Sequence, residues 1–155
     1  MGAEARLKEL GIELPPPLKP AGNYVGATTA GSMVYLSGEG PRKPDGVIAG
    51  KVGRDLSVEE GQAAARLVGL NMLTTLRNEI GSLDRVKRIV KVFGMVNATE
   101  DFKRHPDVIN GFSDLMVEVF GDAGRSARSA VGMASLPFQI AVEVEMIVEI
   151  DPEAS

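Results

Sequence analysis

The chain contains no cysteine and no tryptophan, and it has a single histidine, His105. Without cysteine it can form no disulfide, no thiolate metal site and no thiol nucleophile. The lone histidine also argues against RNA cleavage, which needs two positioned groups that titrate near neutral pH. His105 directly precedes a proline that can open a helix, where a capping or surface role is the simpler interpretation.

Long apolar runs and clustered positive charge are also missing. No stretch approaches the roughly 20 apolar residues that span a bilayer, and no basic segment precedes an apolar run near Met1, so we expect a cytoplasmic protein without a membrane partner. The 17 Lys and Arg against 21 Asp and Glu give a net charge of −4. Because nucleic-acid binding depends on concentrated positive charge, we expect no nucleic-acid partner.

No metal ion and no cofactor are expected. The glycine-rich stretch 38–43 lacks the Gly-Lys-Ser/Thr ending with which a lysine reaches phosphates, so it is interpreted as a loop.

The composition, 44% hydrophobic and 25% charged, is that of an ordinary globular protein. A chain of this length fits one domain, which can bury about 70% of the surface of its unfolded chain. Residues 1–20 are expected to form an N-terminal extension, with at best a short helix over residues 1–13 before the extended triplet Pro15-Pro16-Pro17. Residues 21–151 are expected to form the single domain.

Two helices are predicted by their periodicity. Ser57 and Glu60 form a capping box, apolar residues then recur at intervals of three and four, and Gly81 is a plausible end. Pro106 can occupy the first turn of a second helix, which Gly121 ends.

Several strands are predicted from β-branched runs and alternation. A hairpin is expected over residues 24–29 and 33–37, followed by a loop over 38–46 and a short strand within 47–52. Residues 86–96 are typical of a central strand covered on both faces, and residues 130–134 are strand-like. Residues 140–150 alternate strictly, with glutamates on the face opposite the apolar one.

This order favours an α+β two-layer sandwich, a mixed or antiparallel sheet with both helices packed on one face. Its other face is left without a covering layer. If apolar side chains such as Val34, Leu36, Ala141 or Ile147 point outward there, the chain should self-associate.

Two positions are candidates for chemistry. Arg128 stands before a strand-like run, where it is either an ordinary surface charge or a planar fork for a carboxylate. Glu143 and Glu145 share one face of the last strand, as an acid–base pair or as part of a solvated face. The residues alone leave both questions open.

Several segments together resemble the RidA/YjgF family, also called the L-PSP endoribonuclease-like family. Near the C-terminus, an Ala-Arg-Ser run is followed by Leu-Pro and by a strand similar to the family's Val-Glu-Ile-Glu. Upstream, two elements are similar to its Gly-Pro-Tyr and Ser-Gly-Gln, and another run resembles its central strand. The resemblance covers roughly residues 20–150, through the segments 22–24, 37–38, 90–93, 127–131, 136–137 and 142–147.

The resemblance implies a chorismate-mutase-like fold, a homotrimer, and pockets for a small carboxylate-bearing ligand at the subunit interfaces. It implies hydrolytic deamination of enamines and imines to 2-keto acids and ammonia, with Arg128 as carboxylate anchor and Glu143 orienting the water. Tyr24, Ser37 and Ser129 would line the pocket. The alternative is a trimer of the same fold that binds a small carboxylate, or acts as a regulator, without turnover; an endoribonuclease is disfavoured.

The chain departs from the family pattern near the expected pocket. Ala130 stands where typical enamine deaminases have cysteine, and Glu39 where they have glutamine. The family's pocket asparagine corresponds either to Ser113, by gapless alignment, or to Asn110, with an insertion. A carboxylate at Glu39 would disfavour an anionic substrate unless it points away or pairs with a nearby cation.

Overall fold

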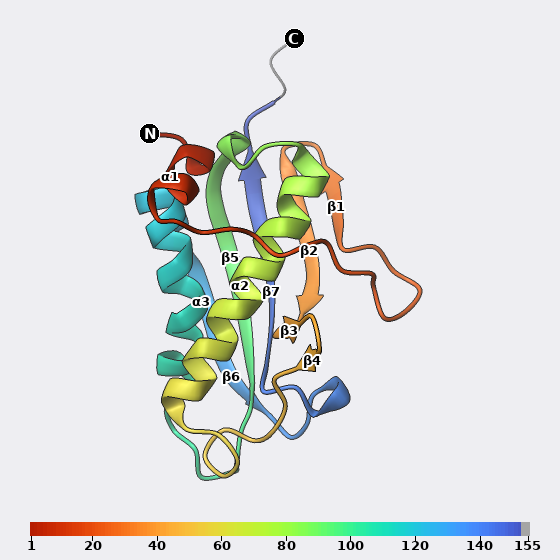
Figure 1. Ribbon diagram of the computed structural model, residues 1–155, viewed down its shortest axis with the longest axis vertical. Helices are drawn as coiled ribbons and strands as arrows, with labels where there is room; N and C mark the ends of the chain where they lie inside the picture. The colour runs from red at the N-terminus through yellow and green to blue at the C-terminus, as the bar shows by residue number, and fades with distance from the viewer. Residues whose placement is uncertain (153–155) are drawn as a thin grey trace.

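Five strands form one mixed sheet in the order β1-β2-β7-β5-β6, in a computed structural model that describes residues 1–152 (Figure 1). Only the β5–β6 pair is parallel; the other neighbours are antiparallel. The predicted α+β class with a mixed sheet is confirmed. The strands are β1 Ala27–Ala30, β2 Met33–Glu39, β5 Val86–Asn97, β6 Ala127–Met133 and β7 Val142–Ile150.

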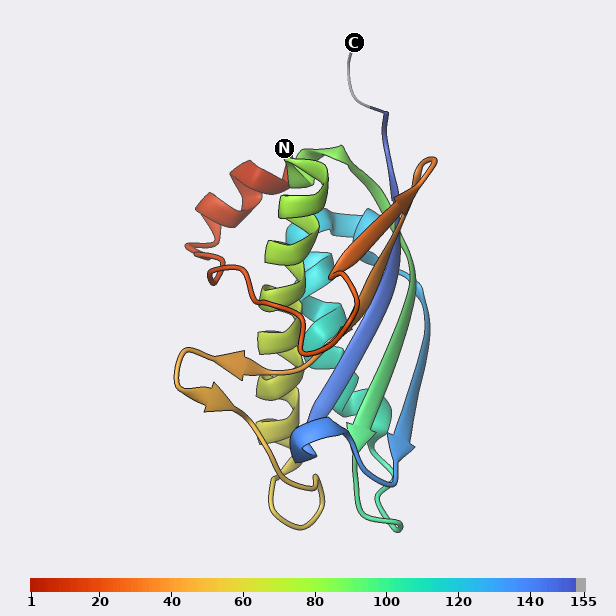
Figure 2. The ribbon, with the colours of Figure 1, turned by 90° about the vertical axis from the view of Figure 1, so that its right-hand side faces the viewer.

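Two long helices, α2 (Val58–Ile80) and α3 (His105–Phe120), cover one face of the sheet (Figure 2). The predicted capping box begins α2: Ser57 Oγ accepts from the Glu60 amide, and Glu60 Oε1 accepts from the Ser57 amide, each at 3.1 Å. The described residues also form three short 3₁₀ turns, namely η1 Leu83–Arg85, η2 Gly121–Gly124 and η3 Pro137–Gln139.

The two long helices cross at very short range. A Cβ placed on Gly111 of α3 would lie 2.1 Å from the backbone oxygen of Gln62 on α2. Beside this crossing, Gln62 Nε2 donates to the Asp107 backbone oxygen at 2.9 Å. Only glycine therefore lets α3 approach α2 so closely. Further along the two helices lie several of the largest fully buried side chains of the core, among them Phe112, Met72, Leu73, Leu115 and Met116.

The N-terminal residues form a helix, α1 (Ala3–Glu9), that packs onto the helical layer; Leu7 is only 2% exposed. The Glu4 carboxylate accepts two hydrogen bonds from Arg77 and one from the Leu83 amide. Partial burial alone would raise the pKa of Glu4, but these hydrogen bonds hold it below its ordinary value. The division into an extension and a domain stays a prediction.

The predicted loop 38–46 is wrong in part. It contains a small antiparallel hairpin, β3 (Arg42–Lys43) and β4 (Gly46–Val47). Strands of two residues have too few positions for an alternating pattern to be visible. The short strand expected within 47–52 is correspondingly reduced to the end of β4 and isolated bridges at Ala49 and Val52.

No helix of the described chain covers the outer face of the sheet (Figure 2). Val34, Leu36 and Ala141 are buried, so they do not form this face, whereas Tyr35 is 48% exposed on it. Strand β5 was expected to be covered on both faces, but this holds only for residues 94–97, because the half nearer its start leaves Lys87 and Arg88 exposed. Within residues 1–152 no helix is long and apolar enough to cross a membrane.

Candidate active site

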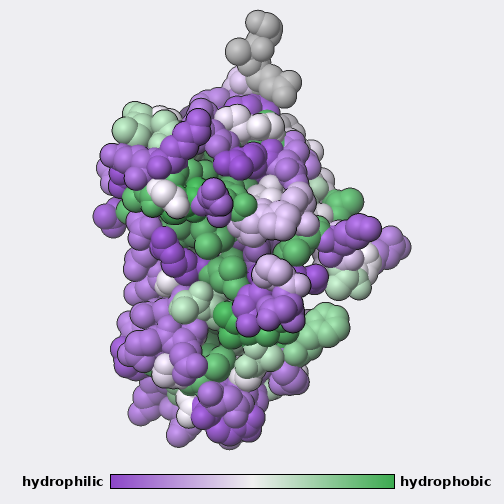
Figure 3. Space-filling model, viewed as in Figure 1, coloured by the Kyte–Doolittle hydropathy of each residue, from purple (hydrophilic) through white to green (hydrophobic). Residues whose placement is uncertain are grey.

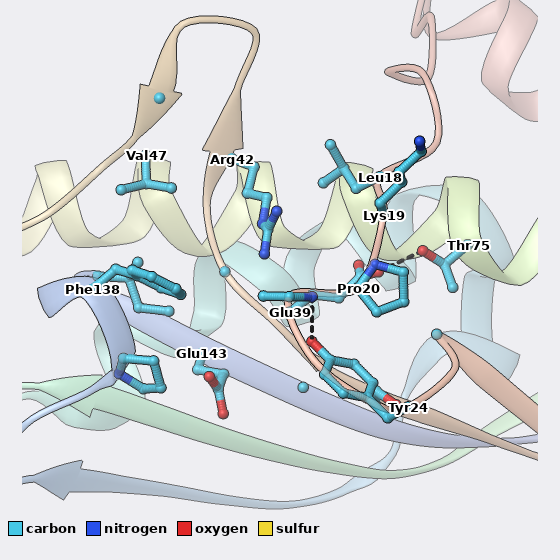
Figure 4. A pocket seen from close by; sticks show the side chains of 18 residues that line it. Leu18, Lys19, Pro20, Tyr24, Glu39, Arg42, Val47, Thr75, Phe138 and Glu143 are labelled. Carbon is cyan, nitrogen blue, oxygen red and sulfur yellow. Dashed lines mark hydrogen bonds between the residues drawn. The ribbon is translucent and has the colours of Figure 1, made fainter.

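A pocket of about 560 Å³ lies where β2 continues beyond Ala27, the first residue of β1. The strand β2 is irregular there, with a register shift against β7 between Leu36 and Glu39. Four further segments enclose the space: residues 18–24, which we call the strap, the β3–β4 hairpin, the η3 turn, and Thr75 on α2 (Figure 4). The site is thus built from parts that are far apart in the sequence.

Glu143 lies in this pocket on the outer side of β7. The neighbouring strand gives it room, because a Cβ on Gly38 would lie 2.8 Å from Glu143 Oε2. Burial raises the pKa of Glu143 above its ordinary value, and the charge of Glu145 raises it further. A carboxylate with a raised pKa is a stronger base, suited to accept a proton from water.

Glu39 is a second carboxyl group in the same pocket. Its Oε1 accepts a hydrogen bond from Thr75 Oγ1 at 2.5 Å, while its buried Oε2 has no hydrogen-bond partner within residues 1–152. Burial raises the pKa of Glu39, opposed by the Thr75 hydrogen bond and by the positive charge of Arg42. Glu39 therefore points away from the pocket centre, beside Pro20 of the strap and toward α2 (Figure 4).

Ser37 fixes the chain directly after the strap, and Tyr24 makes a hydrogen bond within the strap. Ser37 Oγ donates to the Val25 backbone oxygen at 2.6 Å, and the Tyr24 hydroxyl accepts from the Ala21 amide at 3.3 Å. The Tyr24 ring is 47% exposed, so one side of it faces outward. Four predicted site residues, namely Tyr24, Ser37, Glu39 and Glu143, are therefore brought together in one pocket.

Arg128 lies elsewhere, on the edge strand β6, where its side chain contacts Asn110 and Ser113 of α3. Its Nη1 donates to Asn110 Oδ1 at 2.8 Å and to Ser113 Oγ at 3.2 Å, and its Nη2 donates to the Pro106 backbone oxygen at 3.4 Å. Both candidates for the pocket asparagine thus contact the arginine. Within residues 1–152 no carboxylate forms an ion pair with Arg128, whose partners are all uncharged.

These two groups of residues form separate half-sites in one chain. Strand β6 is three positions from β2 in the sheet, a separation of about 14 Å at the usual strand spacing. Ser129 and Ala130 follow Arg128 on β6, opposite Phe93 and Gly94 of β5, and neither lines the pocket. The resemblance places all these residues in one site, which the single chain does not do.

His105 takes no part in the pocket. Its ring packs edge-on against Phe102, with centroids 5.1 Å apart, and Nε2 lies 2.6 Å from where a Cβ on Gly132 would be. Among residues 1–152 no three side chains of His, Asp or Glu converge to hold a metal ion.

The sequence interpretation missed three contributors to the pocket: Thr75, residues 18–21 of the strap, and Phe138. Thr75 is one polar residue within a helical stripe, and nothing local shows that it faces Glu39. Phe138 directly follows the Leu136-Pro137 motif, so its place in the sequence could have suggested a pocket residue. Its unusual backbone conformation could not be read from the sequence.

Besides this fold, a mixed five-stranded sheet with two helices on one face, the sequence itself matches one family over nearly the whole chain. Residues 4–150 match the family described as "YjgF/chorismate mutase-like, putative endoribonuclease". The chain belongs to the RidA/YjgF family.

Relatives of this RidA/YjgF chain cover almost its full length. It is 45% identical over 149 residues to Protein TCP17 of Trypanosoma cruzi, covering 95% of this chain and 93% of that protein. A solved protein of unknown function from Agrobacterium tumefaciens is 43% identical with a TM-score of 0.87, covering 97% and 92% of the two chains. A solved Shewanella oneidensis protein with the same endoribonuclease description is 34% identical with a TM-score of 0.92, covering 97% and 100%.

The buried carboxyl group of Glu39 leads to a prediction for stability in this family member. The pKa of Glu39 is higher in the folded state than in the unfolded state, so at neutral pH the ionised carboxylate lowers the stability of the folded state. This destabilisation disappears below the unfolded pKa, near pH 4. We expect Glu39→Gln to raise the melting temperature by about 3 °C at pH 7.5 and to have little effect at pH 4.

The exposed Glu100→Gln is the control, with no comparable pH-dependent gain expected. Melting temperatures of both variants between pH 4 and 8 provide the test. A Glu39→Gln variant less stable than the wild type at pH 7.5 would show that the carboxylate is well satisfied in the folded protein.

Proposed function

We propose that the chain is a RidA-type hydrolase that converts reactive enamines and imines to 2-keto acids and ammonia. In a homotrimer, Arg128 of one subunit would complete the pocket of its neighbour. The observation that carries the proposal is the state of Arg128, a guanidinium held by neutral partners only, with no carboxylate within the described chain to balance its charge. Such a group is prepared for the carboxylate of a ligand.

Arg42 is the other arginine to consider, because it lines the pocket of its own chain. Its positive charge lowers the pKa of Glu39, so it is already balanced by a neighbouring carboxyl group. Arg128 has no such counter-charge. This difference favours Arg128 as the carboxylate anchor.

The uncovered outer face of the sheet supports self-association. Tyr35 is 48% exposed and Val131 is 36% exposed on strands that no helix covers on that side. A closed assembly would bury these side chains and would also bring the edge strand β6 of one subunit near the pocket of another. One arrangement would thus account for both the apolar surface and the two half-sites.

The chemistry needs little acid–base power. With the substrate carboxylate held by Arg128, the imine carbon faces a water molecule that Glu143 orients and partly deprotonates. The water oxygen bonds to the imine carbon while a proton goes to the nitrogen. The hydroxyl proton of the resulting carbinolamine then goes to the nitrogen as well, the C–N bond breaks, and 2-keto acid and ammonia leave.

Ala130 is compatible with this mechanism, since water is the nucleophile and no thiol is required. The alternative, a trimer that binds a small carboxylate without turnover, uses the same residues and also accommodates Ala130. RNA cleavage has the least support, because His105, the single histidine of the chain, lies outside the pocket.

The proposal predicts that two inactive variants complement each other. Arg128→Ala and Glu143→Gln should each be nearly inactive toward 2-iminopropionate generated in situ, measured by 2-keto acid and ammonia release. In every mixed trimer, one pocket combines the intact Arg128 of one subunit with the intact Glu143 of another. Equal mixing by co-expression should therefore recover about a quarter of the wild-type activity.

Each other result has a distinct meaning. An active wild type with an inactive mixture would place the whole site within one chain. If the wild type releases no keto acid but a small carboxylate raises its melting temperature, the non-catalytic alternative is correct, since a ligand selective for the folded state stabilises it.

A further inference from the structure

Phe138 is an aromatic residue in an unusual position. Its side chain is 73% exposed although it lines the pocket. Its backbone has φ 57° and ψ 16°, and the next residue, Gln139, has φ 55°. Bulky residues rarely adopt this left-handed conformation, and where they do the surrounding structure must enforce it.

The η3 turn that carries Phe138 is held by its surroundings. The Gln139 backbone oxygen accepts from the Gly50 amide at 2.8 Å, and the Gln139 amide donates to the Leu136 oxygen at 2.9 Å. The fully buried Asn97 also reaches Gln139 and in turn accepts from Lys51 Nζ at 2.8 Å. A strained turn supported in this way holds the exposed Phe138 ring in one place.

The ring belongs to an apolar wall of the pocket. Leu18 and Pro20 of the strap, Val47 of β4 and Ile140 also line the cavity, and Figure 4 shows Phe138 between Val47 and Glu143. In Figure 3, green and pale green apolar atoms lie in the region of the η3 turn, next to purple polar atoms over the β3–β4 hairpin. The pocket thus has a carboxyl group, Glu143, beside a broad apolar surface.

In the single chain the cavity is about 560 Å³, a volume typical of pockets for ligands much larger than three carbons, and its apolar wall extends beyond what a three-carbon substrate can contact. We propose that the pocket selects 2-imino acids with a large apolar side chain, and that Phe138 is a specificity-determining residue that packs against this side chain. The inference rests on the proposed function and specifies its substrate class.

The test compares imines generated in situ from alanine, leucine and phenylalanine by an amino-acid oxidase. The wild type should hydrolyse the leucine-derived imine with a kcat/KM about 30-fold above that of the alanine-derived one, from the burial of three additional carbon atoms. Phe138→Gly should reduce this ratio about tenfold. Phe138→Leu, which keeps an apolar side chain, should retain most of it.

The glycine variant also separates folding from function. Because glycine adopts positive φ without strain, Phe138→Gly should not lower the melting temperature. An unchanged preference in Phe138→Gly, or equal turnover of all three imines by the wild type, would overturn the inference and leave the hydrolase function intact. Dissociation of the assembly in Phe138→Gly would also overturn it, since the ring would then serve subunit contact.

A binding series makes failure of the inference distinguishable from failure of the hydrolase function. Melting temperatures are measured with pyruvate, 4-methyl-2-oxopentanoate and phenylpyruvate at equal concentrations. If no imine is hydrolysed but the larger acids stabilise the wild type more than pyruvate does, and Phe138→Gly loses the difference, the ligand class stands without the catalysis. Equal stabilisation by all three acids would overturn the inferred class.

Discussion

Replacing Arg128 by alanine is expected to lower kcat/KM for imine hydrolysis about a thousandfold, because the substrate carboxylate then has no fixed partner. The guanidinium is oriented before the ligand arrives by hydrogen bonds to Asn110, Ser113 and the Pro106 oxygen. An anchor oriented in this way contributes to binding and also places the imine carbon at the water. The measurement is 2-keto acid release by matched amounts of wild type and variant.

Two further variants show what the loss means. Arg128→Lys keeps the charge but not the planar fork, so it should recover only part of the activity. Arg42→Ala should cost much less than Arg128→Ala, since the charge of Arg42 is balanced by Glu39. If Arg42→Ala is inactive and Arg128→Ala is active, the anchor lies within the pocket's own chain and the proposed shared site is wrong.

Gly111→Ala is expected to be the most damaging small substitution in the helical layer, lowering the free energy of unfolding by about 4 kcal/mol or preventing folding. The added Cβ would lie 2.1 Å from the Gln62 backbone oxygen, and a backbone atom cannot move aside by changing rotamer. The helices α2 and α3 would have to separate and lose packing around Phe112. The higher helix propensity of alanine, up to about 1 kcal/mol, is too small to compensate.

Gly31→Ala is the matched control for this prediction. Gly31 has φ 63° in the turn between β1 and β2, and a Cβ there meets nothing within 4 Å. Only backbone strain remains, so the loss should be about 1 kcal/mol. Urea unfolding of both variants makes the comparison, and equal losses would show that the helix crossing relaxes easily.

Much of the fold could be predicted because the signals are local. The capping box at Ser57 and Glu60 and the apolar stripe after it define α2, and strict alternation defines β7 with Glu143 on the outer side. The hairpin β3–β4 could not be predicted, because its strands have two residues each. The burial of Leu7 could not be predicted either, since it depends on where α1 lies against the helical layer.

The candidate site also contains some residues that the sequence could predict and others that it could not. The motif around Arg128 and the outward parity of Glu143 were visible in the sequence, as were Tyr24 and Ser37 in their short elements. The roles of Thr75 and Phe138 were not, because each depends on a partner distant in sequence: Glu39 for Thr75, and Gly50 and Asn97 for the turn that carries Phe138.

Local sequence was therefore enough to specify the two long helices and the longer strands and which face of each is apolar, since these follow from periodicity and capping within a few residues. Tertiary structure alone decided that Arg128 and Glu143 lie on strands β6 and β7, which β5 separates, and that the Glu39 carboxyl group is buried against Thr75. The reason is physical: strand order and burial depend on pairings between residues far apart in the chain, and no local pattern encodes them.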